Sequence, residues 1–224
     1  MNPANSKNKM KAIIFDMDGV VLDSEKHWDK EVFGLFKKLT GNWTREKHER
    51  IVGLNTHDLF GALKKSGIKM SEKVFSKEVD TIAMRIYRTK AEVMPGFIDL
   101  AKSLLKKGIA IGLASSSKIS WITYALKKSK LTHYFFSISS SQEVKEGKPD
   151  PDIYLLAAQK MGFPASDCVA VEDSANGVRA AKAAGCFTIG FRYGGNDDQD
   201  HLLADLDLRG FTPKNNQKIL ELLS

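Results

Sequence analysis

The chain contains little cysteine and no long apolar run. Cys168 and Cys186 are its only cysteines in 224 residues, which are too few for a disulfide framework or a zinc knuckle. No apolar run approaches the ~18 residues that a membrane span needs. The first ten residues, MNPANSKNKM, lack the apolar stretch of a signal peptide. We therefore expect a protein of the reducing cytoplasm without a membrane partner.

Positive charge is in excess but is not concentrated in one region. The formal net charge is +7, with 27% charged and 42% apolar residues, which is typical of a globular protein with a real core. There is no arginine-rich arm and no basic stripe interleaved with aromatic residues, so nucleic acid is not an expected partner. A basic surface instead favours small anionic substrates through electrostatic steering. The lysine pairs lie far apart and indicate solvated helix faces: Lys37-Lys38, Lys64-Lys65, Lys106-Lys107 and Lys127-Lys128.

Short β-rich runs alternate with helical patterns over most of the chain. This alternation predicts right-handed βαβ crossovers and an α/β fold, with a Rossmann-like parallel sheet covered on both faces. The predicted strands are Lys11–Phe15, Ile109–Ala114, Phe135–Ser139, Cys168–Glu172 and Phe187–Phe191. The predicted helices between them are Phe97–Lys107, Ile119–Ser129, Pro151–Met161 and Asn176–Ala184.

One long segment after the first strand breaks the alternation. Between Ser24 and Glu92 there are helical patterns and no convincing strand, and Met94-Pro95-Gly96 marks the return to the sheet. This predicts a small inserted helical domain with two connections to the rest. We place the α/β core at residues 1–23 and 93–224 and the insertion at residues 24–92. The helical patterns of the insertion are Trp28–Leu39, His57–Ser66 and Glu72–Arg88.

Polar and charged side chains follow the predicted strands. In a parallel sheet the carboxyl ends of the strands meet at one edge, where ligands bind. We therefore expect the side chains that follow four of the strands to converge there. These are Asp16 and Asp18 after the first strand, Ser115, Ser116 and Ser117 after the second, Lys148 beyond the third, and Glu172 and Asp173 after the fourth.

Such a cluster of carboxylates repels itself unless a cation lies among them. All-oxygen ligation favours a hard ion, and Mg²⁺ fits here because it binds only a few carboxylates and keeps several waters. Magnesium together with a lysine and a serine hydroxyl suits the binding of a phosphoryl group. Asp16, at a strand terminus, is then placed to attack phosphorus and form an aspartyl phosphate. Asp18, two residues on, is placed to protonate the leaving oxygen and later to take a proton from water.

These residues carry a resemblance to a known family. Asp16-Met-Asp18-Gly19-Val-Val, Ser115, Lys148-Pro149 and Glu172-Asp173-Ser174 resemble, in order and spacing, the four motifs of the haloacid dehalogenase superfamily. The resemblance covers nearly the whole chain. Leu-Asp-Ser-Glu after the first motif and the helical insertion are similar to the branch that contains sugar-phosphate phosphatases and β-phosphoglucomutase. The insertion corresponds to the cap that closes over the site and selects the substrate in that family.

The resemblance also implies a role for each matching residue. Asp16 would be the nucleophile and a magnesium ligand, and Asp18 the acid and base that also binds the metal through its backbone carbonyl. Ser115 would hydrogen-bond the phosphoryl oxygens, and Lys148 would neutralise the nucleophile and the phosphate. Asp173 would be a magnesium ligand, with Glu172 either a ligand or a residue behind the ligands.

Some residues have a structural interpretation that we prefer. We expect Asp23 to be the N-cap of the helix that follows it, and Asn176 to cap a helix or bond the backbone. Ser116 and Ser117 suit capping of the helix at Ile119, although Ser116 or Lys118 could also touch the substrate. The five histidines show no ligand spacing, so packing or solvated roles are expected for them. Trp28, Phe33 and Phe36 lie at helical spacing and are interpreted as the core of the insertion.

The sequence favours a magnesium-dependent phosphatase of a small phosphate ester, a sugar phosphate by resemblance, acting as a monomer. One alternative is a β-phosphoglucomutase-type mutase, which would need a histidine and an arginine in the cap. The matching positions here hold Trp28 and Thr56, although a basic side chain from the end of the cap could supply a phosphate contact. A non-catalytic binding module is the third alternative. The candidate basic side chains are Arg85, Arg88 and Lys90.

Overall fold

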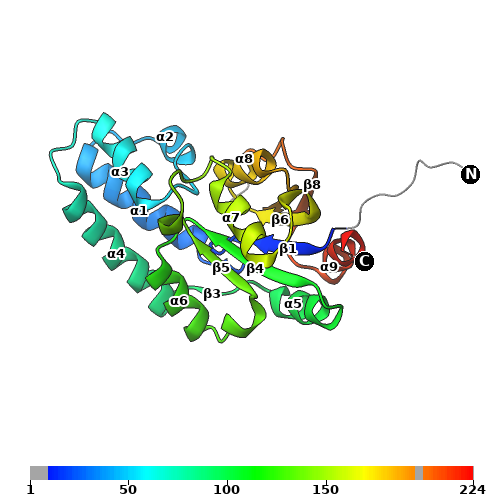
Figure 1. Ribbon diagram of the computed structural model, residues 1–224. Helices are drawn as coiled ribbons and strands as arrows, with labels where there is room; N and C mark the ends of the chain where they lie inside the picture. The colour runs from blue at the N-terminus through cyan, green and yellow to red at the C-terminus, as the bar shows by residue number, and fades with distance from the viewer. Residues whose placement is uncertain (1–9, 195–198, 224) are drawn as a thin grey trace, which may run out of the picture.

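A computed structural model describes residues 10–194 and 199–223. Its centre is a parallel sheet in the strand order β5-β4-β1-β6-β7-β8, which confirms the predicted α/β class (Figure 1). All five predicted strands are present, with ends displaced by two residues at most, as at β5. The strands are β1 (Ala12–Phe15), β4 (Ala110–Ser115), β5 (Ser137–Ser140), β6 (Cys168–Glu172), β7 (Phe187–Arg192) and β8 (Leu206–Arg209).

Alternate residues of β1 face the two sides of the sheet, and each side is covered by helices. Ile13 and Phe15 belong to a large apolar cluster with α5 (Phe97–Lys106), α6 (Ile119–Lys128) and α9 (Pro213–Leu222). On the other side, Ala12 and Ile14 pack with α7 (Asp152–Met161) and α8 (Ala175–Ala184). Because both faces of β1 are buried, its run of apolar residues is continuous rather than alternating.

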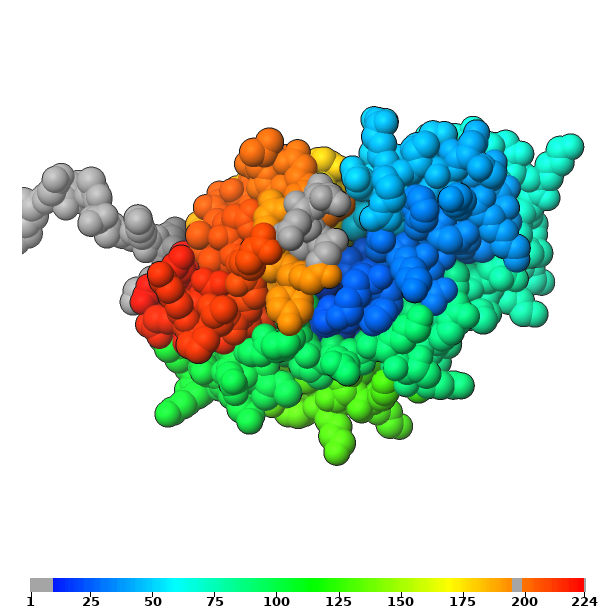
Figure 2. All heavy atoms as spheres, turned by 180° about the vertical axis from the view of Figure 1, so that it is seen from behind, coloured from blue at the N-terminus to red at the C-terminus, as the bar shows by residue number. Residues whose placement is uncertain are grey.

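Four helices lie beyond the carboxyl end of β1, gathered to one side of the sheet (Figure 1). Aromatic rings hold this helical group together, with Phe36 contacting Trp43 and Phe75, and Phe75 contacting Phe60. Seen from behind, the group abuts the rest of the molecule directly (Figure 2). It consists of α1 (Glu25–Thr40), α2 (Arg45–Glu49), α3 (Thr56–Lys65) and α4 (Glu72–Thr89).

The two connections between the helical group and the sheet run side by side. β2 (Leu22–Asp23) and β3 (Glu92–Val93) pair as a short antiparallel ladder. The boundaries that we place at residues 23/24 and 92/93 fall in this ladder and stay a prediction. None of the helices within residues 10–194 and 199–223 is long and apolar enough to cross a membrane.

Two expected helix caps are wrong. The N-cap of α1 is Ser24, because Asp23 belongs to β2 and its carboxylate pairs with Lys26. Ser116 and Ser117 do not cap α6, because its N-cap is Lys118, and the Ile119 N–H donates to Oε1 of Gln142. The two serine hydroxyls are committed to other partners in the site described next.

Candidate active site

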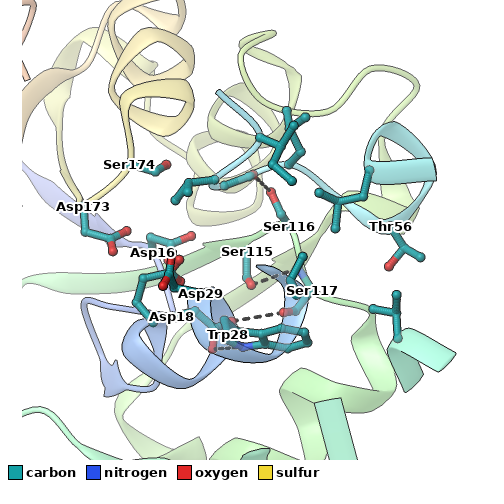
Figure 3. A pocket seen from close by; sticks show the side chains of 18 of the residues that line it. Asp16, Asp18, Trp28, Asp29, Thr56, Ser115, Ser116, Ser117, Asp173 and Ser174 are labelled. Atoms are coloured by element: carbon teal, nitrogen blue, oxygen red, sulfur yellow. Dashed lines mark hydrogen bonds between the residues drawn. The ribbon is translucent and has the colours of Figure 1, made fainter. Parts of the chain in front are cut away.

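The sheet brings the predicted residues to one pocket (Figure 3). Asp16 follows β1, Ser115 ends β4, and Asp173 follows β6, so each lies at the carboxyl end of a strand. Figure 3 shows Asp16, Asp18 and Asp173 on one side, facing the serines, with Thr56 at the opposite end. Lys148 reaches the same centre from the loop after β5, although its buried side chain stands behind the pocket wall.

Lys148 links two carboxylates beneath the pocket. Its Nζ donates to Oδ1 of Asp16 at 2.6 Å and to Oε1 of Glu172. Burial by itself lowers the pKa of Lys148, but the charges of Asp16 and Glu172 outweigh it and hold the pKa above its usual range. Lys148 is therefore a fixed cation beside Asp16.

The ionised form of Asp16 is disfavoured even with Lys148 beside it. Burial raises its pKa to about 8, with Lys148 opposing the shift and the charges of Glu172 and Asp18 adding to it. Oδ1 is bonded to Lys148, whereas Oδ2 has no hydrogen-bond partner among the described residues. One oxygen of a strand-terminal carboxylate is thus left facing the pocket.

Glu172 is completely buried and accepts hydrogen bonds on both oxygens. Oε1 accepts from Lys148 and from the hydroxyl of Tyr154, at 2.7 Å for the latter. Oε2 accepts from the N–H groups of Asp173 and Ser174 and from the Ser174 hydroxyl. A Cβ on Gly177 would lie 2.0 Å from this carboxylate, so only glycine leaves room for it. Glu172 therefore fixes Lys148 and the turn that carries Asp173.

Asp18 accepts four hydrogen bonds from neutral donors. Ser24 and the Trp28 indole donate to Oδ1 at 2.6 and 3.1 Å, and Tyr87 and Ser117 donate to Oδ2 at 2.8 and 3.1 Å. Burial raises the pKa of Asp18, while these hydrogen bonds lower it. A carboxyl group surrounded only by neutral donors can hold or release a proton without breaking an ion pair.

Sequence reasoning missed these partners of Asp18. Trp28 was expected only in the core of the insertion, yet its indole lines the pocket and its ring contacts Tyr87 and Trp121. Phe36 does lie in that core. Tyr87 gave no signal, because it stands 69 residues after Asp18 and reaches it only through the packing of α4.

The three serines after β4 have separate partners. Ser115 Oγ accepts the Ser117 N–H at 3.1 Å, and its own O–H has no acceptor among the described residues. Ser116 Oγ donates to the Gly53 carbonyl at 2.6 Å, and Ser117 Oγ donates to Asp18. Ser115 is therefore the serine with a donor available to a ligand.

Asn176 ties the loop between α2 and α3 to the sheet domain. Its Nδ2 donates to the carbonyls of Arg50 and Val52, at 3.1 and 2.7 Å, which confirms the expected bonding to backbone. At Gly53, where φ is +81°, a Cβ would lie 2.4 Å from Ser174 Oγ. The helical group thus touches the loop after β6 so closely that a side chain at residue 53 would not fit.

The expected magnesium site has suitable donors but no complete side-chain cluster. Among the described residues, no three His, Cys, Asp or Glu side chains are arranged to hold a metal ion. Oxygen donors are nevertheless close together, because Gly19, with φ +84°, lets the Asp173 carboxylate approach to 1.9 Å from where a Cβ would stand. Two carboxylates and a backbone carbonyl are a fitting set for Mg²⁺, which keeps several waters.

The basic residues expected to reach a substrate phosphate do not line the pocket. Arg85 and Lys90 pair with Glu31 at 2.6 and 2.8 Å, and Arg88 is exposed. Arg85 and Lys90 are thus held at α1 by Glu31, and neither supplies the phosphate contact that a basic side chain of the cap could make. His201, for which a packing or solvated role was expected, is buried near the site with its Nε2 2.8 Å from the Asp173 carbonyl oxygen.

Comparison with known proteins agrees with this architecture. The family model described as haloacid dehalogenase-like hydrolase matches residues 13–191. The phosphorylated carbohydrates phosphatase of Thermotoga maritima is 32% identical over 177 residues, covering 79% of this chain and 82% of the relative. The β-phosphoglucomutase of Bacillus subtilis is 31% identical over 208 residues, covering 89% of each.

The fold is shared with solved structures as well. A crystal structure of β-phosphoglucomutase from Clostridium difficile matches with a TM-score of 0.78 and 23% identity, covering 96% of this chain and 97% of that one. The fold and the pocket define a hydrolase built on a parallel α/β sheet. The chain belongs to the haloacid dehalogenase-like hydrolases. Both the predicted family and the predicted enzyme class, a phosphatase of this type, are confirmed.

Proposed function

We propose that this chain is a magnesium-dependent phosphatase of a small phosphorylated metabolite, a sugar phosphate, and that it works through an aspartyl phosphate. The observation that carries the proposal is the Asp16 carboxylate. One of its oxygens is held by Lys148, and the other faces a pocket shared with Asp18 and Ser115. A nucleophile, a proton carrier and a hydroxyl donor thereby surround one site.

In the first half of the reaction, Oδ2 of Asp16 attacks phosphorus and the bond from phosphorus to the ester oxygen breaks. Asp18 donates its proton to that leaving oxygen. In the second half, Asp18 takes a proton from water, the water oxygen bonds to phosphorus, and the bond to Asp16 breaks. Inorganic phosphate leaves, and both carboxyl groups return to their starting states.

The remaining site residues hold the phosphoryl group. Ser115 donates its hydroxyl to a phosphoryl oxygen, and Lys148 balances the charge on Asp16. Ser116, bonded to Gly53, contributes to binding by ordering the loop above the phosphate. Magnesium, when bound by Asp16, Asp173 and the Asp18 carbonyl, would neutralise the phosphoryl oxygens. Glu172, with its donors already in place, would position Lys148 and Asp173 rather than bind the metal.

The helical segment, residues 24–92, is proposed to act as a cap that closes over the pocket and selects the ester. The phosphorylated carbohydrates phosphatase relative supports a sugar phosphate. We further propose a monomer of the cytoplasm that binds neither nucleic acid nor membrane. Cys168 and Cys186 are free and buried, which suits a reducing compartment.

A β-phosphoglucomutase-type reaction is the second candidate, and the Bacillus subtilis relative favours it. Trp28 speaks against it, because its indole N–H is held by Asp18 and offers no basic nitrogen to a sugar. A non-catalytic binding module is less well supported, because the reactive residues are all present.

The test is phosphate release from hexose, pentose, polyol, nucleotide and triose phosphates, with magnesium or with EDTA, for the wild type and for Asp16→Asn. We expect magnesium-dependent release that Asp16→Asn lowers by at least about 1,000-fold, since covalent catalysis is lost. Parallel samples are assayed for isomerised sugar phosphate. Isomer without free phosphate would establish the mutase, and turnover that survives in Asp16→Asn would refute the covalent route.

A further inference from the structure

The part of the pocket away from Asp16 is mostly apolar. It is formed by the helical group and by α6, and the rings of Trp28 and Trp121 stand 5.8 Å apart in it. Aromatic rings of this kind pack against the C–H face of a ligand. The apolar side chains that line this part are Trp28, Val32, Ile51, Val52, Leu54, Leu59, Val79 and Trp121.

No lysine or arginine side chain among the described residues lines this pocket. Several cations of the surrounding elements are occupied elsewhere. Lys118 donates to Ser76 and Asp80, and Arg45 donates to both oxygens of Asp29. A second anionic group on a ligand would therefore lose its water without gaining an ion pair, which is costly.

Glu25 is the acidic side chain of this pocket that lacks a partner. It lines the pocket at the start of α1, and its carboxyl group makes no hydrogen bond or ion pair among the described residues. Asp29, one turn further along α1, is by contrast bonded to Arg45 and His48. Burial raises the pKa of Glu25 well above its usual range, and the charges of Asp18 and Asp16 raise it further, so the pocket has a negative field here.

We propose that the pocket selects phosphate monoesters whose leaving group is uncharged and carries hydroxyls. Glu25 bonds one of these hydroxyls. Esters whose leaving group carries a second phosphate or a carboxylate are rejected. This inference rests on the proposed phosphatase function and narrows its substrate. The tryptophan rings cover the apolar face of the leaving group, and Glu25 meets its polar edge. Charge exclusion follows because the described residues of the pocket lining offer an added anion no lysine or arginine, and the nearby Arg45 is already bonded to both oxygens of Asp29.

The test compares matched pairs of esters that differ by one anionic group. Glucose 6-phosphate is paired with glucose 1,6-bisphosphate, and glycerol 3-phosphate with 3-phosphoglycerate. We expect kcat/KM to favour the partner with one anionic group by at least about 100-fold, because like-charge contacts in a site shielded from water are strongly unfavourable. Equal or reversed kcat/KM values within both pairs would overturn the proposal.

Two variants of Glu25 then distinguish its role in substrate selection from a nonspecific loss of activity. Glu25→Gln should raise KM for the hydroxyl-bearing esters about tenfold and should change KM for p-nitrophenyl phosphate, which offers no hydroxyl, by a smaller factor. Glu25→Lys should shift the preference within each pair toward the ester with two anionic groups by at least about tenfold. Glu31→Gln, on the same helix but outside the pocket, is the matched control. Unaltered preferences in both Glu25 variants would overturn the assignment.

Binding keeps this inference separate from the reaction itself. Calorimetry on Asp16→Asn measures the affinity of each pair when no turnover occurs. Absence of hydrolysis by the wild type, with the charge preference retained in binding, would refute the phosphatase and leave the selection rule. Hydrolysis of all esters, without a preference in binding or kcat/KM, would refute the selection rule and leave the phosphatase function.

Discussion

The carboxyl groups of this site differ in the donors around them. Asp16 has one oxygen on a cation and one facing the pocket, whereas Asp18 is held by four neutral donors. Glu172 has donors on both oxygens and no exposed surface. These surroundings suit three tasks, which are attack on phosphorus, movement of a proton, and support of the neighbouring residues.

His48 offers a prediction about pH at the scale of one residue. Its Nδ1 accepts the Trp43 indole N–H at 3.3 Å, so its Nε2 carries the proton that faces Asp29. Burial lowers the pKa of His48 from 6.5, with Arg45 acting the same way and Asp29 opposing. The unfolded chain therefore takes up a proton at higher pH than the folded protein, so folding loses stability as pH falls below about 6.5.

We expect the free energy of unfolding, measured by urea denaturation from pH 7.5 to 5, to fall more steeply in the wild type than in His48→Gln. His133→Gln, which replaces an exposed histidine, is the control and should follow the wild type. Parallel curves for the wild type and His48→Gln would show that His48 is not buried in the neutral form.

At the scale of elements, the loop from Arg50 to Asn55 joins the two halves of the pocket. It connects α2 and α3, and its carbonyls accept hydrogen bonds from Ser116 and Asn176. Ser116 directly follows Ser115, the last residue of β4, and Asn176 lies in the first turn of α8, just after Asp173. We therefore expect closure of the helical group to be coupled, through these hydrogen bonds, to the positions of Ser115 and Asp173 in the site.

Asn176→Ala tests this connection. The loss of two hydrogen bonds, each worth about 0.5–1.5 kcal/mol, should lower the opening free energy of residues 50–54 by about 1–3 kcal/mol in native-state hydrogen exchange. Asn215→Ala is a matched control, because Asn215 donates to two carbonyls at Arg209 and Gly210, away from the pocket. Equal protection of residues 50–54 in all three proteins would contradict a latching role for Asn176.

At the scale of the whole molecule, the carboxylate cluster should couple metal binding to stability. A ligand that binds only the folded state stabilises it by an amount that grows with the logarithm of ligand concentration relative to Kd. Millimolar MgCl₂ should therefore raise Tm, measured by differential scanning fluorimetry. Asp173→Asn should raise Tm in EDTA, because one repelling charge is gone, and should abolish most of the magnesium-induced rise.

Asp99→Asn, which removes an exposed carboxylate on α5, serves as the control for ionic strength. It should keep the full magnesium response. A rise in Tm of equal size in Asp173→Asn would show that the ion binds elsewhere.

Much of the fold was predictable because strands and helices of a parallel α/β domain have strong local patterns. β8 (Leu206–Arg209) and α9 (Pro213–Leu222) were missed, and β8 is short, lies at the sheet edge and buries only Leu208 completely. The short α2 was missed for a similar reason, since its five residues include one buried side chain, His48. Short elements with few buried residues carry little periodic signal.

The order of apolar runs and polar residues along the chain is enough to predict which residues gather at the carboxyl edge of the sheet. Asp16, Ser115 and Asp173 each end or follow an apolar run, Lys148 lies in the loop beyond β5, and parallel pairing brings the strand ends to one edge whatever the helices do. By contrast, the bonds from Trp28 and Tyr87 to Asp18, and from Asn176 to the loop at Arg50, arise from packing in three dimensions. The same packing leaves Glu25 without a partner among the described residues. Those contacts depend on how α1 and α4 pack against the sheet domain, and such long-range packing leaves no period or spacing in the chain.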